Sequence, residues 1–302
     1  MKYYIAIPTY NGGEGWRKVA TNILKFSPKN LFVHVIDSGS KDDTLAIAEN
    51  ANFDVVKILG TDFNHGGTRN QAVYTFIDDY DLIIFLTQDA IPQHNFVEKI
   101  ISVFDDQNIA CAYGRQLPHK NANPLAQHAR KFNYADKSYV CGKDDIPQMG
   151  IKTAFMSNSF SAYRLSVFKE LGGFPSDTIL CEDMYYTAKA ILAGYQVAYV
   201  ADAVVEHSHN YTPVEEFKRY FDIGVFHSNE RWIRDKFSGA SKEGQKFIVS
   251  EIKYLLKKAP FWIPYACMNN LMKMLGYKLG QLHNKLPKST IKKLSMHKRY
   301  WD

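Results

Sequence analysis

The feature that most constrains how this chain can fold is a short, wholly apolar segment in its first third. The segment Asp81-Leu-Ile-Ile-Phe-Leu-Thr-Gln-Asp89 places five consecutive apolar residues between polar ends. Such a run is typical of a strand that is buried on both faces of a mostly parallel sheet. Pro92 follows, and we expect it to prevent simple continuation of the ladder. Because ligands in open α/β sheets bind beyond the carboxyl ends of the strands, Asp89 is a candidate ligand-binding residue. An ordinary turn or helix cap at Asp89 is the alternative.

Apolar runs and helical patterns alternate along most of the chain. We expect strands at residues 3–8, 31–36, 55–59, 82–87, 110–113, 157–163 and 196–200. Helices are expected at residues 16–26, 44–50, 71–78, 96–105, 165–171, 184–192, 217–237, 245–258 and 263–282, and residues 117–151 are expected to form a long irregular insertion. This alternation predicts an α/β fold with a doubly wound, mostly parallel sheet. We place the α/β domain at residues 1–238 and amphipathic helices with a basic tail at residues 239–302, with the domain edge at Ser238-Gly239.

The positive charge of the chain is concentrated near its C-terminus. Between Ile252 and Asp302 there are 11 basic residues and one acidic residue, whereas residues 1–251 carry 26 basic and 30 acidic residues. This asymmetry argues against nucleic acid as a partner of the core and favours an anionic surface as a partner of the tail. The four cysteines form no CxxC pair, which suits a reducing compartment. The chain shows neither a signal peptide nor an apolar run of about 18 residues, so we expect a cytoplasmic protein without a spanning helix.

Three polar loops follow the first, second and fourth predicted strands: Thr9-Tyr-Asn-Gly-Gly13, Asp37-Ser-Gly-Ser40 and Gln88-Asp89. We expect these loops to form one cleft, because the carboxyl ends of neighbouring parallel strands meet at one edge of a sheet. There, Asp37 can accept an N–H group of a nucleotide base, and Asp89 can hold Mg²⁺ or Mn²⁺ against a pyrophosphate. Arg69 lies at a Gly-rich helix start, where a guanidinium can meet phosphate oxygens; a helix-surface arginine is the alternative.

These motifs resemble those of family-2 glycosyltransferases with the GT-A fold, and in particular those of bacterial rhamnosyltransferases. The resemblance covers about residues 3–237. It rests on Ile7-Pro-Thr-Tyr-Asn11, Val35-Ile-Asp-Ser-Gly-Ser40, Phe63-Asn-His-Gly-Gly-Thr-Arg-Asn70, Leu86-Thr-Gln-Asp-Ala90, Gly172-Gly-Phe174 and Glu182-Asp183. Many family members carry Asp-x-Asp where this chain has Thr87-Gln88-Asp89, so only the last carboxylate is kept. The resemblance implies a GT-A nucleotide-sugar-binding domain with a C-terminal helical extension.

The resemblance also implies a role for individual residues. Asp183 matches the catalytic base, which removes the proton of an acceptor hydroxyl; a helix-start carboxylate that favours the helix dipole is the alternative. The implied metal ligands are Asp89 and His207, with His209 as the second choice, and the implied cofactor is Mn²⁺ or Mg²⁺. The nucleotide sugar would be bound by Pro8, Thr9, Tyr10, Asn11, Asp37, Ser38, His65, Arg69, Gln88 and Asp89. The acceptor side would include Ser157, Asn158 and Glu182.

The activity that the resemblance implies is an inverting, metal-dependent hexosyl transfer. The donor would be dTDP-β-L-rhamnose, and the acceptor a hydroxyl of a lipid-linked cell-surface polysaccharide precursor. A family-2 transferase that uses a UDP-hexose is the alternative enzyme. A non-catalytic scaffold of the same fold is a further alternative, suggested by Gln88 in the metal motif. The linkage, the metal and the oligomeric state are left open by the sequence.

An apolar stripe runs along the helix expected at residues 263–282. Its members recur at three- and four-residue steps and are Met268, Leu271, Met272, Leu275, Leu279 and Leu282. Further basic residues follow in the tail. One interpretation is a helix that docks on the catalytic domain or pairs two subunits. The other is a surface anchor, in which the stripe or the tail meets anionic headgroups at the inner face of the cell membrane.

Overall fold

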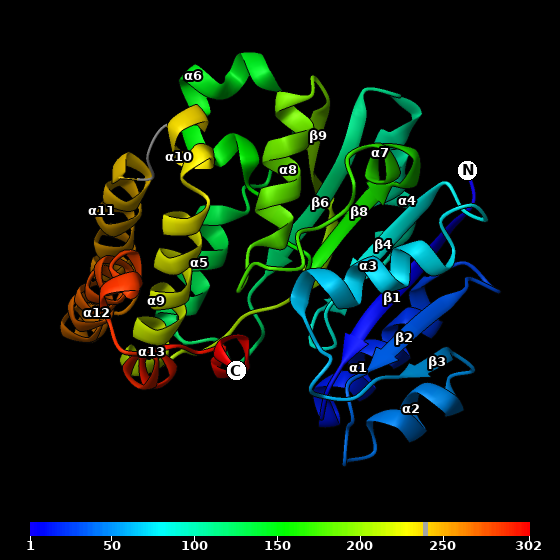
Figure 1. Ribbon diagram of the computed structural model, residues 1–302, viewed down its shortest axis with the longest axis horizontal. Coiled ribbons are helices and arrows are strands. Elements are labelled where there is room, and N and C mark those ends of the chain that lie inside the picture. The colour runs from blue at the N-terminus through cyan, green and yellow to red at the C-terminus, as the bar shows by residue number, and fades with distance from the viewer. Residues whose placement is uncertain (238–240) are drawn as a thin grey trace.

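A mixed β-sheet forms the centre of the molecule, with helices on both of its faces (Figure 1). The computed structural model describes residues 1–237 and 241–302. Within these residues nine strands form one sheet in the order β3-β2-β1-β4-β8-β6-β9-β5, with β7 paired to β9. The strands are β1 (Tyr3–Thr9), β2 (Val33–Asp37), β3 (Asp54–Lys57), β4 (Leu82–Leu86), β5 (Ile91–Pro92), β6 (Ile109–Leu117), β7 (Tyr139–Cys141), β8 (Phe160–Arg164) and β9 (Gln196–Glu206). The helices are α1 (Gly13–Phe26), α2 (Thr44–Asn50), α3 (His65–Thr75), α4 (Phe96–Ile101), α5 (Pro124–Asn133), α6 (Ile146–Met149), α7 (Leu165–Glu170), α8 (Glu182–Leu192), α9 (Pro213–Asn229), α10 (Arg231–Phe237), α11 (Ser241–Lys258), α12 (Ile263–Gln281) and α13 (Lys288–Leu294).

The sheet is parallel only in part, which corrects the expectation of a mostly parallel sheet. β1 pairs in parallel with both β2 and β4, and β2 pairs in parallel with β3. β8 then lies antiparallel between β4 and β6, and β6 pairs in parallel with β9. Since β1, β2 and β4 run in the same direction, their carboxyl ends meet at one edge of the sheet. The three polar loops that follow them lie together there, as predicted.

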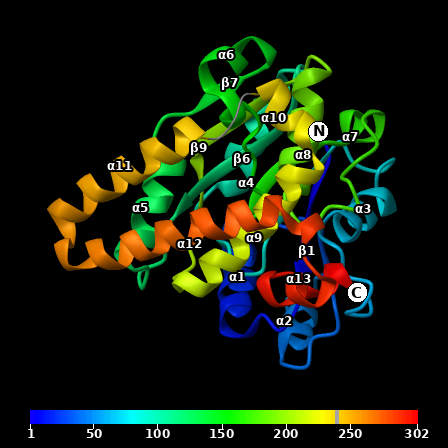
Figure 2. The same ribbon diagram turned by 60° about the vertical axis from the view of Figure 1, so that its left-hand side comes forward.

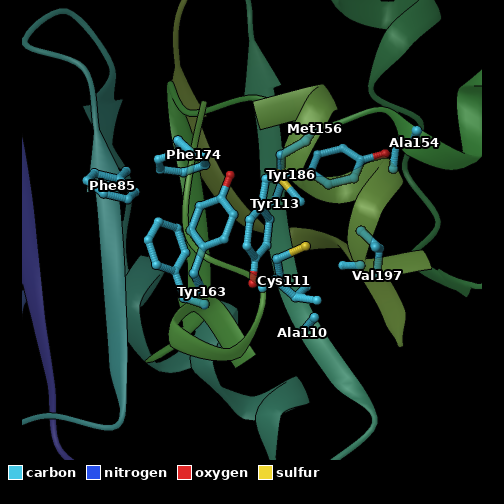
Figure 3. Close-up of a cluster of buried hydrophobic side chains, with 14 of the residues drawn as sticks. Phe85, Ala110, Cys111, Tyr113, Ala154, Met156, Tyr163, Phe174, Tyr186 and Val197 are labelled. Atoms are coloured by element: carbon cyan, nitrogen blue, oxygen red, sulfur yellow. The ribbon is translucent and has the colours of Figure 1, made fainter. Parts of the chain in front are cut away.

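The central strand β4 is buried on both faces, as its apolar sequence predicted. Ile83 and Phe85 point into one apolar layer, and Leu82, Ile84 and Leu86 point into the other. This is the alternation that a β-strand imposes on successive side chains. Figure 3 shows the first layer, where Phe85, Tyr163 and Phe174 pack together with ring centroids 5.2–5.9 Å apart. With a core on each side, the strand cannot slip by one residue without burying the wrong face.

Two helical regions differ from the expectation. The insertion at residues 117–151 is not irregular throughout, because it contains α5, which begins at an Asn123 cap whose Oδ1 accepts a hydrogen bond from Ala126 N. Pro124 occupies the first turn of that helix, and such an Asn-Pro pair is a helix-start signal in the sequence. The single helix expected at residues 217–237 is instead α9 and α10, which are separated at Glu230, where the backbone leaves the helical region.

Helix α12 packs on α9 through glycines (Figure 2). A Cβ atom on Gly276 would lie 2.2 Å from the carbonyl oxygen of Phe217, and one on Gly280 would lie 2.0 Å from that of Phe221. The two backbones therefore approach closely on this side. The predicted apolar stripe lies mostly elsewhere: Met268, Leu271, Leu275 and Leu282 are exposed. No helix within residues 1–237 and 241–302 has the length and apolar character needed to cross a membrane.

The C-terminal tail is folded onto the α/β domain. After α13, Arg299 Nη1 donates a hydrogen bond to the carbonyl oxygen of Gly60 at 2.9 Å, and Tyr300 Oη donates to Asp177 O at 2.8 Å. The tail thus crosses from the C-terminal helices to the loop after β3. The domain edge expected at Ser238-Gly239 lies outside the described residues, and the helices on its two sides, α9 and α12, pack against each other.

We expect Gly276→Ala to lower the free energy of unfolding by about 1–3 kcal/mol, the usual cost of overpacking a tight contact. Gly244→Ala on α11 is the matched control, since no described atom lies within 4 Å of its Cβ position. That control should gain about 1 kcal/mol from helix propensity. Urea unfolding of both variants measures the difference. Equal stabilities would contradict the close approach of α9 and α12.

Candidate active site

Strand pairing brings the candidate metal ligands together. β5 lies antiparallel to the end of β9, with Ile91 opposite Glu206. Asp89 precedes β5 and His207 follows β9, so the antiparallel register places them side by side. Asp89 Oδ2 lies 3.4 Å from His207 Nε2 and 3.6 Å from His209 Nε2. Pro92, which we expected only to interrupt the ladder, lies in this short edge strand, a position that tolerates proline.

His207 is oriented by a glutamine that no sequence pattern marks. Gln116, at the end of β6, accepts a hydrogen bond at Oε1 from the Arg130 guanidinium of α5, and the same oxygen lies 2.9 Å from His207 Nδ1. A guanidinium can only donate, so Oε1 is the acceptor and His207 carries its proton on Nδ1. In the neutral ring the lone pair of Nε2 therefore faces Asp89, whereas in the protonated ring an N–H group faces it. A glutamine that holds a histidine in this way would orient a metal-bound imidazole.

The electrostatics of the cluster suit a cation. Burial opposes the ionisation of Asp89, but the hydrogen bond and charge of His207, with a smaller effect of His209, hold the pKa of Asp89 below its usual range. Burial, followed by the effect of His207, lowers the pKa of His209 to about 4, so that this imidazole is neutral near pH 7. The three ligand atoms lie within 4.8 Å of one another. One carboxylate and two imidazoles suit Mn²⁺ better than Mg²⁺, which prefers oxygen ligands.

Gln88 links the loop after β4, which carries Asp89, to the loop after β1. Its Oε1 accepts a hydrogen bond from Tyr10 N at 2.8 Å, and its Nε2 donates to Tyr10 O at 3.0 Å. Both ends of the amide are used in this way, so Gln88 fixes the loop and Asp89 alone of the pair faces the histidines. The Tyr10 ring remains half-exposed at the edge of the cleft.

Asp37 organises the loop after β2 and is fully buried. Its carboxylate accepts hydrogen bonds from the hydroxyls of Thr9 and Ser40 and from the backbone N–H groups of Gly39 and Ser40. A nucleotide N–H group would therefore have to replace one of these donors. Ser38 is also buried, and its Oγ has no hydrogen-bond partner among the described residues.

The other residues of the first loop connect it to β2 and to the loop after β2. Pro8 lies within β1 opposite Ile36, and Asn11 adopts a φ of 47°. Asn11 Oδ1 accepts a hydrogen bond from Lys41 N at 2.8 Å. Of the four residues predicted here to bind the nucleotide, Tyr10 is therefore the one whose side chain is free for a ligand.

Arg69, which we predicted to bind the nucleotide sugar, is turned into the protein. Its guanidinium is buried, lies 3.2 Å from Glu182 Oε1 and donates to the carbonyl oxygen of His65 at 3.0 Å. The reason is that α3 already begins at His65, earlier than predicted, and this turn directs Arg69 into the protein. His65 itself is partly buried at the same helix start, and burial lowers its pKa.

The Asn-His-Gly-Gly-Thr-Arg-Asn motif joins α3 to the loop after α7. Asn70 Nδ2 donates to Phe174 O at 2.8 Å, and Asn70 Oδ1 accepts from Phe174 N at 2.9 Å. Asn64 caps α3 by accepting from Gly67 N and also donates to the carbonyl oxygen of Ser176. A Cβ on Gly66 would lie 1.9 Å from a carbonyl oxygen of that loop, so only glycine fits there. This motif and the Gly172-Gly-Phe174 motif, which are distant in the sequence, thus pack against each other.

Asp183 lies in the first turn of α8 and is positioned by backbone groups. Its Oδ2 accepts from Asn158 N at 3.1 Å and its Oδ1 from Met184 N at 2.7 Å. Burial and the neighbouring charge of Glu182 raise the pKa of Asp183 to about 7. Burial also opposes the ionisation of Glu182. The charge of Arg69, with smaller effects of other neighbouring groups, outweighs burial and lowers the pKa of Glu182. A carboxyl group with a pKa near 7 is suited to take up a proton near neutral pH.

Asn158 and Glu182, which we predicted on the acceptor side, contact each other next to Asp183. Asn158 Nδ2 donates to Glu182 Oε1 at 3.0 Å, and both side chains are buried. They therefore hold the Asp183 turn. Ser157 is partly exposed and accepts a hydrogen bond from Gln116 Nε2 at 2.8 Å, so it lies between this turn and the metal cluster.

Comparison with known proteins decides the family. Residues 4–172 match the family model described as Glycosyl transferase family 2. The chain belongs to this family. The O-antigen chain rhamnosyltransferase RfbN of Salmonella typhimurium is 56% identical, with 100% of this chain and 96% of the relative covered. The O-antigen chain rhamnosyltransferase WbaN of Salmonella anatum is 51% identical, with 99% of this chain and 96% of the relative covered.

Solved structures show the same fold. The mannosyltransferase PcManGT from Pyrobaculum calidifontis, in complex with GDP-Man and Mn²⁺, aligns with a TM-score of 0.65 at 15% identity, over 94% of this chain and 88% of that one. S. aureus TarS 1–349 aligns with a TM-score of 0.54 at 16% identity, over 94% of this chain and 91% of that one. The predicted GT-A fold of a family-2 glycosyltransferase, with its C-terminal helical region, is confirmed.

We expect this family-2 glycosyltransferase to need Gln116 for tight Mn²⁺ binding. Gln116→Leu should weaken Mn²⁺ affinity about 10–100-fold, the usual effect of losing a group that orients a metal-bound histidine. Gln71→Leu, at an exposed position of α3, is the matched control and should bind like the unchanged protein. Electron paramagnetic resonance of free Mn²⁺ during a titration measures both. Tight binding by the Gln116→Leu protein would exclude this role.

Proposed function

We propose that this family-2 glycosyltransferase transfers L-rhamnose from dTDP-β-L-rhamnose, with inversion, to a hydroxyl of a lipid-linked O-antigen precursor. The identity of the transferred sugar is inferred from the similarity, over nearly the whole chain, to two proteins named O-antigen chain rhamnosyltransferases. The site supports the chemistry, because it holds a base candidate and a metal-ligand cluster on the same edge of the sheet. The donor nucleotide and the inversion follow from the family resemblance.

In this proposal Asp183 is the general base. The acceptor oxygen attacks the anomeric carbon of the donor, the bond from that carbon to the diphosphate oxygen breaks, and the acceptor proton moves to the Asp183 carboxylate. The backbone N–H groups of Asn158 and Met184 hold that carboxylate in place. Burial, together with the charge of Glu182, keeps the proton affinity of Asp183 high, and Arg69 stabilises the Glu182 carboxylate.

The leaving diphosphate needs positive charge. Asp89, His207 and His209 would hold a divalent ion, which when bound neutralises charge on the diphosphate. Gln116 keeps the His207 lone pair turned toward that position. Tyr10, Thr9, Asp37 and Ser38 surround the part of the cleft that we assign to the nucleoside.

The test is turnover with a panel of nucleotide sugars and a lipid-linked saccharide acceptor. We expect dTDP-β-L-rhamnose to be used with Mn²⁺ and transfer to stop in EDTA. Asp183→Asn should lower kcat by about 10²-fold or more with little change in nucleotide affinity, because the amide cannot accept the proton. Since the base must be ionised, activity should rise with pH through about 7.

Several outcomes would contradict the proposal. Preferential use of a UDP-hexose would reject the donor. Near-normal turnover by the Asp183→Asn protein would reject the base, and transfer at full rate in EDTA would reject the metal. Absence of turnover with every donor, alongside tight nucleotide binding, would favour a non-catalytic scaffold.

We also propose that the α11–α12 hairpin, rather than the tail, meets the membrane that carries the acceptor. Figure 2 shows the two helices extending together to one side of the molecule. Leu256, Phe261 and Met268 are exposed on them by 60%, 96% and 50%, respectively. Exposed Lys257 and Lys258 flank the turn. Exposed apolar groups next to lysines suit an anionic bilayer surface, where each basic residue contributes about 1 kcal/mol.

Sedimentation with vesicles tests this surface. The full chain should sediment with phosphatidylglycerol vesicles at low salt and not with phosphatidylcholine vesicles. Phe261→Asp should abolish sedimentation, whereas Leu24→Asp, at an exposed apolar position of α1, should not. A full chain that stays in the supernatant with anionic vesicles, or a Phe261→Asp protein that still sediments, would exclude the hairpin.

A further inference from the structure

The segment at residues 296–302 lies against the loops that follow β1, β2 and β3. We call the carboxyl end of these strands, where the proposed function places the nucleotide sugar, the donor edge of the sheet. Arg299 Nη1 donates to the carbonyl oxygen of Gly60 at 2.9 Å, and its guanidinium carbon lies 5.9 Å from the centre of the Tyr10 ring. Gly60 is in turn next to the loop after β2: a Cβ at Gly60 would lie 3.0 Å from Ser38 O. Arg299 therefore stands where the loops after β1, β2 and β3 come together.

The tail is held firmly in this position. The backbone N–H groups of Met296 and His297 donate to Asp222 Oδ2 at 2.9 and 3.0 Å, and Asp222 is wholly buried on α9. Tyr300 Oη donates to Asp177 O on the other side of the segment, and Asp302 pairs with Lys292. Terminal segments are commonly poorly ordered unless contacts hold them. This segment has such contacts on both of its sides.

The tail also touches the network behind the base. His297 Nδ1 lies 3.4 Å from His65 Nε2, and the two rings meet edge to face with centroids 4.8 Å apart. The carbonyl oxygen of His65 accepts a hydrogen bond from Arg69, which pairs with Glu182 beside Asp183. The segment is thus in contact with the structure that supports both the donor edge and the base.

Arg299 supplies a cation at this edge. Arg69, the cation expected to face the nucleotide, is buried and neutralised by Glu182. Arg299 is exposed, and its one side-chain hydrogen bond among the described residues goes to a carbonyl oxygen and not to a carboxylate. Most of the five N–H groups of a guanidinium remain available after that bond. A planar guanidinium beside an aromatic ring is also a surface on which a base can stack.

We propose that residues 296–302 form a wall of the nucleotide-sugar site and that Arg299, together with Tyr10, binds the nucleoside end of the donor. This inference rests on the proposed function for the location of the nucleotide, and it adds a binding residue from outside the region that carries the family motifs. His297 is a positioning residue, since it fixes the segment against His65.

The test is calorimetric titration of dTDP and dTMP into the full-length protein in Mn²⁺. Arg299→Ala should weaken both ligands by about 10-fold or more, the size of effect that loss of a base-stacking partner produces. Lys298→Ala is the matched control, because this neighbouring side chain is exposed and makes no hydrogen bond among the described residues. A chain that ends after Met296 should bind at least as weakly as Arg299→Ala.

Distinct results separate this inference from the proposed function. If the unchanged protein binds another nucleoside diphosphate and not dTDP, the donor assignment fails, and the same variants are then compared with that nucleotide. If Arg299→Ala binds as tightly as Lys298→Ala, the role of Arg299 is overturned, whatever the truncated chain does. If only dTDP and not dTMP is weakened, the guanidinium meets the terminal phosphate and the assignment to the nucleoside end is overturned.

Discussion

The burial of β4 between two apolar layers is the constraint on which the rest of the site depends. Because its five side chains are shared between both cores, the strand has one register and its carboxyl end has one position. The turn from Thr87 to Ala90 then leads into β5, whose pairing with β9 places Asp89 beside His207. A ligand cluster assembled from two strand ends needs no flexible loop to close it.

Two adjacent carboxylates show how packing gives different chemistry to similar residues. Glu182 and Asp183 are neighbours in the first turn of α8, and a helix turns successive side chains about 100° apart. Glu182 points toward Arg69 and Asn158 and stays charged in a buried position. Asp183 has no cation paired with it among the described residues, and burial together with the charge of Glu182 raises its pKa. Removing either partner of a buried ion pair is costly, which ties the base to the position of α3.

The C-terminal part of the chain contacts both helix α9 and the loop after β3. Its glycine-lined face lets α12 lie close to α9, and this leaves the apolar stripe open to the surroundings. The tail then turns back and reaches the loop at Gly60. The basic residues that are close together in the sequence are therefore divided between the α11–α12 hairpin and the segment that contacts Gly60, where their surroundings differ.

The sequence by itself determined the α/β fold, the double-sided burial of β4 and the identity of Asp89, His207, His209 and Asp183 as candidate site residues. These follow from patterns local to each segment and from family motifs. Only the tertiary structure decided that Gln116 orients His207, that Arg69 pairs with Glu182 and that Arg299 reaches Gly60. Gln116 and His207 are 91 residues apart, and Arg299 and Gly60 are 239 apart. No local pattern distinguishes an arginine in solvent from one over a site, because that depends on how distant segments pack.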